Sequence, residues 1–191
     1  MVKLRLFICI EIENETLKEK LADLLAKPIF NSLKRVKTEQ MHLTLKFLGE
    51  TDETKLEDIK NQLVGIDYPA FEVRLTGTGC FPGTTHPRVV WAGISEGAEQ
   101  LVTLGKDIDR RMHSLGFPRE KRAFSPHLTL ARVKKADLRM LQDLQRLVLK
   151  HKSTDFGSFT VTKIILKRST LTPQGPIYDD LFAVAPVKEE E

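Results

Sequence analysis

The sequence predicts a mixed fold of helices and strands that is built from two similar halves. Two observations support this prediction. The string His42-Leu43-Thr44-Leu45 returns in the second half of the chain as His127-Leu128-Thr129-Leu130. Short apolar runs that are typical of strands also alternate with stretches whose apolar residues recur at helical spacing, in the same order in both halves. A duplicated unit with the order β-α-β-α-β is therefore expected.

The first half contains patterns for three strands and two helices. The strands are expected at residues 4–10, from His42 to Gly49, and at residues 71–75. One helix follows Asn14, a residue that commonly caps helices, and the other spans about 56–63. The Gly77 to Gly83 segment, with the sequence GTGCFPG, is expected to be a turn-rich loop. Its glycines miss the GxGxxG spacing and do not open a helix, so a dinucleotide site is not expected there.

The second half repeats the pattern. Strands are expected at 88–94, 127–132 and 159–167, and helices at about 101–115 and 141–148. The two pseudo-repeats would thus span about 3–76 and 87–167 within one bilobal domain of residues 1–191. A last strand at 178–184 and a disordered tail at 188–191 complete the expectation.

Composition allows an anionic partner without requiring one. The chain has 191 residues, of which 41% are hydrophobic, and a net charge of +4. Cys9 and Cys80 form no CxxC pair and lie in apolar runs, which is typical of reduced core cysteines. The apolar run from Leu6 to Ile10 is too short for a signal peptide or a membrane span. We therefore expect a cytoplasmic protein without a membrane segment.

The repeated string predicts a phosphate site. Side chains alternate along a strand, so each histidine shares a face with the threonine two residues later. Histidine has a reference pKa of about 6.5, so one copy can accept a proton while the other donates one. Two hydroxyls can hydrogen-bond phosphate oxygens, and nearby cations add charge: Lys37, Lys46, Arg122 and Arg132. This arrangement requires no metal.

These residues resemble the 2H phosphoesterases, and in particular the RNA 2′,3′-cyclic phosphodiesterases, also called 2′-5′ RNA ligases. The matching segments are RLFICIEI, MHLTLKFLGE, FPGTTHPRVVWAGI, SPHLTLAR and LKRSTLTPQGPIY. The resemblance implies a bilobal α+β fold, with mainly antiparallel sheets lining a central cleft and helices outside. It also implies metal-independent hydrolysis of terminal 2′,3′-cyclic phosphate to 2′-phosphate, and reversible 2′-5′ ligation without ATP.

The resemblance assigns roles to the repeated residues. His42 matches the proton donor, His127 the proton acceptor, and Thr44 and Thr129 the hydroxyls that hold the phosphate. The sequence alone does not distinguish donor from acceptor. The expected partners are RNA or nucleotides with 2′,3′-cyclic phosphate ends, bound by a monomer that uses no cofactor and no metal.

Three further residues are weaker candidates. Arg132 resembles a family arginine near the phosphate, yet strict alternation places it on the face opposite His127, unless the strand ends or bulges there. Lys46 shares the face of His42 by the same alternation. Phe81 resembles an aromatic residue that stacks on the terminal base. Alternatives without a functional role are also open. Phe81 could be a core or loop-packing residue, and Thr44 and Thr129 could be ordinary strand formers. Three of the cations could be solvated surface charges: Lys37, Lys46 and Arg122.

The alternative function is a non-catalytic RNA-end binding protein whose site grips a phosphate for recognition only. The intact histidine pair favours the enzyme over this alternative. Assay of metal-free protein on a 2′,3′-cyclic nucleotide distinguishes the two, because only an enzyme forms product.

Overall fold

The computed structural model describes residues 2–187, so the expected disordered tail lies outside the described residues. Four α-helices occur in this part of the chain: α1 (Glu15–Leu25), α2 (Leu56–Val64), α3 (Ala98–Ser114) and α4 (Leu138–Lys150). The strands are β1 (Lys3–Glu11), β2 (Lys34–Arg35), β3 (His42–Asp52), β4 (Glu72–Phe81), β5 (Val89–Glu96), β6 (Leu128–Arg132), β7 (Asp155–Thr160), β8 (Ile164–Thr172) and β9 (Gly175–Val184).

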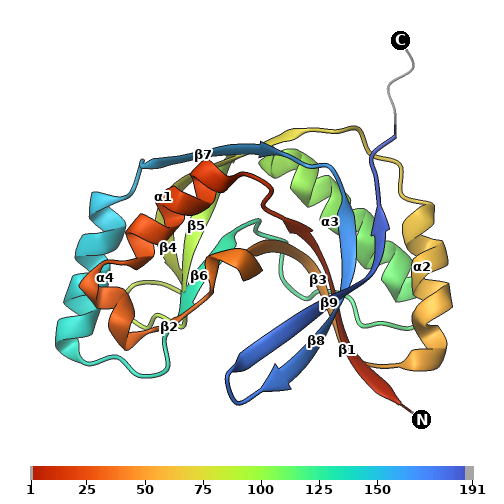
Figure 1. The fold of residues 1–191 in the computed structure, drawn as a ribbon, viewed down its shortest axis with the longest axis horizontal. Helices are drawn as coiled ribbons and strands as arrows, with labels where there is room; N and C mark the ends of the chain where they lie inside the picture. The colour runs from red at the N-terminus through yellow and green to blue at the C-terminus, as the bar shows by residue number, and fades with distance from the viewer. Residues whose placement is uncertain (1, 188–191) are drawn as a thin grey trace.

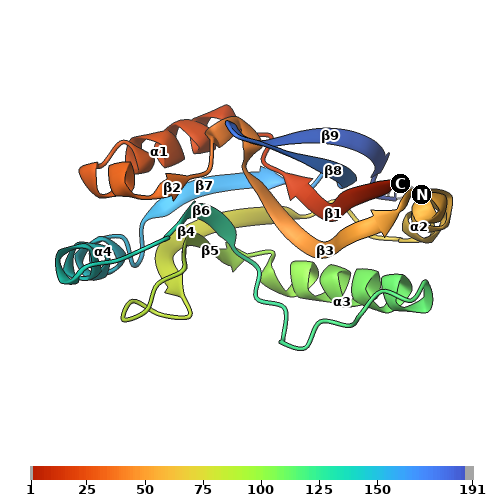
Figure 2. The ribbon, with the colours of Figure 1, turned by 90° about the horizontal axis from the view of Figure 1, so that it is seen from below.

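The strands form one antiparallel sheet of nine strands, curled between two groups of helices. Its order is β7-β4-β5-β6-β3-β1-β8-β9, and the short β2 pairs with β6. Figures 1 and 2 show α1 and α4 toward one end of the molecule and α2 and α3 toward the other. The predicted α+β class is confirmed. The two strands that carry the repeated string, β3 and β6, are neighbours in the middle of the sheet.

Most predicted elements are present with small changes at their ends. Helix α1 begins where Asn14 predicts, because the Asn14 side chain accepts a hydrogen bond of 3.0 Å from the Leu17 N–H. Strand β3 continues through Gly49, which adopts a positive φ of 70° inside the strand. Duplication of the two halves, with the extents given above, stays a prediction.

The expected single strand at 159–167 is wrong, because the structure divides this run into β7 and β8. Strand β7 pairs with β4, whereas β8 pairs with β1 on the other side of the sheet. The run contains no glycine or proline that would indicate a break. The break exists because the chain leaves one side of the sheet and joins the other, and only tertiary pairing decides this.

The expected loop from Gly77 to Gly83 is also wrong for most of its length, since residues 77–81 belong to β4. Gly77 (φ 74°) lies at a register irregularity in the pairing with β5. Gly79 lies under the ring of Trp91, where a Cβ atom would come within 2.2 Å of the indole. These glycines therefore serve a bulge and a close side-chain contact rather than a turn.

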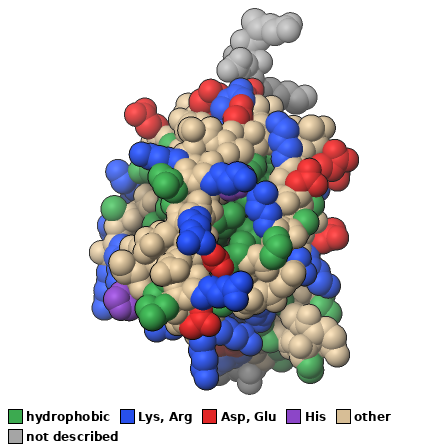
Figure 3. All heavy atoms as spheres, turned by 90° about the vertical axis from the view of Figure 1, so that its left-hand side faces the viewer, with side chains coloured by type: hydrophobic (Ala, Val, Ile, Leu, Met, Phe, Trp, Pro, Cys, Tyr) green, Lys and Arg blue, Asp and Glu red, His purple; other side chains and the backbone are tan. Residues whose placement is uncertain are grey.

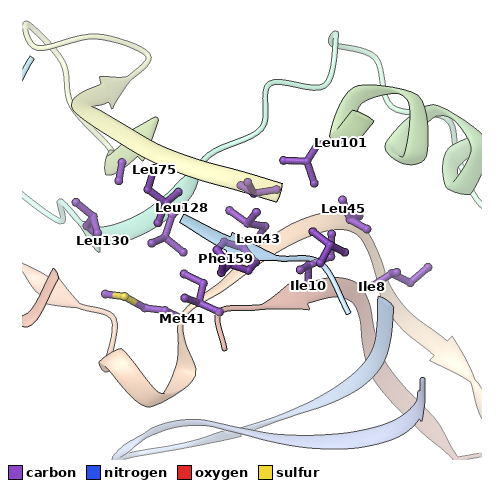
Figure 4. Packing of buried hydrophobic residues seen from close by; sticks show 14 of the residues in the cluster. Ile8, Ile10, Met41, Leu43, Leu45, Leu75, Leu101, Leu128, Leu130 and Phe159 are labelled. Carbon is purple, nitrogen blue, oxygen red and sulfur yellow. The ribbon is translucent and has the colours of Figure 1, made fainter. Parts of the chain in front are cut away.

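The leucines of both repeated strings anchor their strands in the main core. Leu43, Leu45, Leu128 and Leu130 are each at most 4% exposed and belong to one cluster with Leu101 of α3. Figure 4 shows these leucines within the cluster, with Leu43 and Leu128 close together near its middle. Burial of each leucine contributes about 1.5–3 kcal/mol. A slip by one residue would push the histidines and threonines into this core, so the register is strongly fixed.

Within residues 2–187, no helix combines the length and the apolar character needed to span a membrane.

Candidate active site

The two repeated strings meet on adjacent antiparallel strands. Leu43 pairs directly with Leu128, which places His42 opposite Thr129 and Thr44 opposite His127. The four polar side chains therefore share the face of the sheet opposite the leucine core. The two histidines are diagonal neighbours, which strand geometry separates by about 7–8 Å, with a somewhat shorter distance between their Cβ atoms. The structure thus brings together the four residues that the repeat predicted.

Both imidazole rings are held in the same way. Nδ1 of His42 lies 2.8 Å from the carbonyl oxygen of Gln40, and Nδ1 of His127 lies 2.7 Å from that of Ser125. A carbonyl oxygen can only accept, so each Nδ1 carries the proton and donates it. Each Nε2 is then left to exchange a proton with a bound group.

The electrostatic surroundings favour neutral rings when no ligand is bound. Burial lowers the pKa of His42, and Lys167 lowers it further, while the hydrogen bond to Gln40 and the charge of Glu11 oppose this. Burial likewise lowers the pKa of His127, with the Ser125 carbonyl opposing and Arg132 adding to the decrease. A phosphate anion between the rings would act in the other direction and favour protonation.

Aromatic side chains restrict both rings. The ring of Phe7 lies 4.9 Å from the ring of His42, centroid to centroid, and that of Tyr178 contacts His42 edge-on at 5.4 Å. On the other strand, the Phe81 ring lies 4.9 Å from the His127 ring at an interplanar angle of 86°. Phe81 is therefore beside the site, as expected, and its stacking on a base stays a prediction.

Arg132 reaches the histidine face through a β-bulge. Ala131 pairs with Val90 and Thr129 with Trp91, so Leu130 is an extra residue that has no partner in β5. Leu130 and Ala131 are consequently both buried, and the exposed Arg132 returns to the face of Thr129. The bulge removes the conflict between alternation and the family resemblance. Phosphate binding by Arg132 stays a prediction.

An equivalent bulge in β3 removes Lys46 from the site. Thr44 pairs with Cys9 and Lys46 with Ile8, which leaves Leu45 as the extra residue. Lys46 therefore turns into the protein, where its side chain is 1% exposed. Its Nζ donates to Oδ1 of Asp109 at 2.6 Å and to the carbonyl oxygen of Pro118 at 3.1 Å. The prediction that Lys46 binds phosphate is wrong, because alternation fails at the bulge.

The two remaining candidate cations, Lys37 and Arg122, are exposed on the segments that lead into the two histidine strands. Their contact with a phosphate stays a prediction.

Two features of this face were missed by the sequence patterns. Lys167 of β8 is buried beside the site, with Nζ 2.7 Å from Oε1 of Glu11 and a second bond to Asp180. Trp91 of β5 pairs with Thr129 and so lies on the same face. A signal for Trp91 was present in the sequence, because Gly93 follows two residues later in the same strand. The two residues share a face, and a glycine there leaves space for the large indole ring.

The chain has clear relatives among known proteins. A family model described as the 2′-5′ RNA ligase superfamily matches residues 17–171. The chain therefore belongs to this superfamily. It is 39% identical over 176 residues to the RNA 2′,3′-cyclic phosphodiesterase of Methanocaldococcus jannaschii, which covers 92% of this chain and 97% of the relative. The corresponding protein of Aeropyrum pernix is 41% identical over 152 residues, covering 80% and 85%.

A solved structure has the same fold. The crystal structure of TT0787 from Thermus thermophilus superposes with a TM-score of 0.76 at 30% sequence identity, covering 95% of this chain and 97% of that one.

Proposed function

We propose that this protein is an RNA 2′,3′-cyclic phosphodiesterase that converts a terminal 2′,3′-cyclic phosphate to a 2′-phosphate without a metal. The observation that carries the proposal is the antiparallel pairing of the two strings, which places a free Nε2 on each strand with a threonine hydroxyl opposite. Membership in the superfamily and the activity named for the relatives support the same reaction.

The proposed reaction uses the two rings in complementary roles. Neutral His127 takes a proton from water as the water oxygen attacks phosphorus. Protonated His42 donates its proton to O3′ as the P–O3′ bond breaks, which leaves a 3′-hydroxyl and a 2′-phosphate. In-line displacement requires the entering and leaving oxygens to be on opposite sides of phosphorus. Rings on two strands, facing one phosphate from diagonal positions, meet this requirement.

Thr44, Thr129 and Arg132 are proposed to hold the non-bridging oxygens. The two hydroxyls donate hydrogen bonds to these oxygens, and the guanidinium supplies positive charge at the end of β6. Negative charge increases on these oxygens as the pentacoordinate state forms, so the interactions are stronger there than with the bound substrate.

The surface suits a nucleic acid partner. Figure 3 shows Lys and Arg side chains spread over the end of the molecule that carries α1 and α4. Exposed cations in this region include Lys20, Lys34, Arg139, Arg146 and Lys150. Such a surface attracts the phosphates of an RNA chain and would make binding dependent on salt.

Hydrolysis by variants of the histidines tests the mechanism. EDTA-treated protein is incubated with adenosine 2′,3′-cyclic phosphate, and the 2′- and 3′-monophosphates are separated by chromatography. His42→Asn and His127→Asn are each expected to lose about 100-fold or more of the turnover rate. His86→Asn, a change of an exposed histidine in the loop after β4, is the matched control and should retain it. Wild-type turnover by either site variant contradicts the mechanism.

The same assay separates the enzyme from a non-catalytic RNA-end binding protein. Binding of the cyclic nucleotide without product, by the wild-type protein, would favour the binding protein. Formation of a 2′-5′ linkage from RNA ends, in the absence of ATP, would show that the site also runs the reaction in reverse.

Cytoplasmic residence and a monomeric state also belong to the proposal. The two cysteines, Cys9 and Cys80, are free and buried, which is compatible with a reducing compartment. Cell fractionation and light scattering of the purified protein test these two points.

A further inference from the structure

Trp91 is the sole tryptophan of the chain, and it lies flat on the face of the sheet that carries the histidines. Its backbone pairs with that of Thr129, so the two side chains are direct cross-strand neighbours, with Cβ atoms about 4.5–5.5 Å apart by strand geometry. The predicted phosphate-binding hydroxyl and the indole are thus adjacent.

Two glycines give the indole its flat position. A Cβ atom on Gly79 of β4 would come within 2.2 Å of the indole Cζ2, and one on Gly93 within 3.3 Å of Cζ3. Any other residue at Gly79 would displace the ring. One face of the indole therefore rests on the backbone of β4, and the residue remains partly exposed.

Phe81 fixes the indole relative to the candidate site. The Phe81 ring lies 5.1 Å from that of Trp91, and it also contacts the ring of His127 at 4.9 Å. The three rings form a continuous row from the indole to the imidazole. Phe81 is packed between its two neighbours, whereas Trp91 is at the end of the row.

The only polar atom of the indole is not offered to a ligand. Nε1 of Trp91 is buried and has no hydrogen-bond partner among the described residues. A group bound against this ring would meet its π surface and would find no donor that could select a particular base edge. Aromatic surfaces of this kind stack on any nucleobase, because every base has a π face.

From this geometry we propose that Trp91 is the platform on which the base of the terminal nucleotide stacks, while the cyclic phosphate lies at Thr129 and the two histidines. This inference rests on the proposed function. It assigns to Trp91 the stacking role that the sequence suggested for Phe81, and gives Phe81 the role of positioning both Trp91 and His127. It also predicts weak discrimination among the four bases, with purines bound more tightly because they stack over a larger area.

Steady-state kinetics on substrates with and without a base test the platform. Trp91→Leu keeps an apolar side chain but removes the aromatic surface, and it should raise KM for adenosine 2′,3′-cyclic phosphate about 5- to 100-fold with little change in kcat. Trp91→Phe should restore most of the affinity. Hydrolysis of ribose 2′,3′-cyclic phosphate, which has no base, should be unaffected by Trp91→Leu.

Phe47→Leu is the matched control, because Phe47 is an aromatic residue of β3 that is 60% exposed. A KM increase in Phe47→Leu and not in Trp91→Leu would place the base on the other strand and overturn the proposal. An equal loss on substrates with and without a base would show that Trp91 has only a structural role, and would overturn it too.

A binding measurement on the wild-type protein needs no variant and no turnover. Because Trp91 is the sole tryptophan, its fluorescence reports on this position alone. Adenosine 2′-phosphate should quench it saturably, and ribose 2-phosphate should not. Absence of quenching by a nucleotide that binds overturns the platform. Quenching without hydrolysis would instead contradict the proposed function and leave the platform standing.

Discussion

The buried ion pair between Lys46 and Asp109 allows a quantitative prediction about stability. Lys46 is on the histidine strand β3, and Asp109 is on α3. Oδ1 of Asp109 accepts from Lys46 Nζ at 2.6 Å and from the Glu120 N–H at 3.1 Å. The pair thus joins β3, α3 and the segment that leads to His127. The two partners differ in exposure, since the Lys46 side chain is 1% exposed and that of Asp109 is 18% exposed.

This difference predicts unequal costs for removing each partner. Asp109→Ala leaves the buried Lys46 ammonium with the Pro118 carbonyl as its hydrogen-bond acceptor. The nearest remaining carboxylate, that of Glu120, is 4.0 Å away and 55% exposed, so water screens it and it compensates the charge only in part. This variant should lower the free energy of unfolding by about 3 kcal/mol. Lys46→Met leaves the partly exposed Asp109 carboxylate, which still accepts the hydrogen bond from the Glu120 N–H. The methionine side chain fills most of the space of the lysine. We expect a loss of about 1–2 kcal/mol for this variant. The double variant contains no unpaired charge and should be more stable than Asp109→Ala alone.

Urea denaturation followed by circular dichroism measures all three variants against the wild type. Asp109→Ala should have the lowest midpoint of the set. If the double variant unfolds at the same or a lower urea concentration than Asp109→Ala, the argument from the unpaired ammonium is refuted. An equal loss of stability in the two single variants would refute it as well.

The pair also gives stability a dependence on pH. Burial raises the pKa of Asp109, but the hydrogen bonds from Lys46 and Glu120 and the nearby positive charges lower it more, so the pKa is below its ordinary value. A depressed carboxyl pKa stabilises the folded state above the unfolded-state pKa of about 3.9. This stabilisation is lost as the pH falls from there through the folded-state pKa. The difference between wild type and Lys46→Met should therefore shrink in acid.

Three further predictions concern the site and the sheet. Burial lowers the pKa of both His42 and His127, so the form with one neutral and one protonated ring should be most populated below about pH 6.5. The pH profile of kcat/KM should therefore have its maximum in this range, and a maximum above pH 7 would contradict the prediction. Arg132→Gln should lower kcat about 100-fold. Because Arg132 lowers the pKa of His127, the same variant should also shift the part of the pH–rate profile that reports deprotonation of His127 to higher pH. Gly77→Ala should lower the free energy of unfolding, measured by urea denaturation, by at least about 2 kcal/mol, because the new Cβ would lie 2.5 Å from the Lys152 carbonyl oxygen. The control Gly49→Ala has a similar φ and no such neighbour, so its loss should be smaller.

Local pattern was sufficient for much of the fold and for the centre of the site. Alternation along a strand depends only on backbone geometry, so it placed His42 with Thr44, and His127 with Thr129, and it sent the intervening leucines to the core. The repeated string indicated that the two strands belong together. Helix α1 was located by a cap and an apolar stripe, which are also local features.

Tertiary structure decided what happens where regular alternation stops. One extra residue in each histidine strand, Leu45 and Leu130, reverses the alternation that follows, so Lys46 enters the protein and Arg132 reaches the site. The position of a bulge is set by the register with the neighbouring strand, which the strand's own sequence does not contain. The indole over Gly79 has the same origin, because the glycine and the ring that needs its space belong to different strands. Sequence thus determined which faces and which chemical groups exist, whereas pairing between distant strands determined which of them meet.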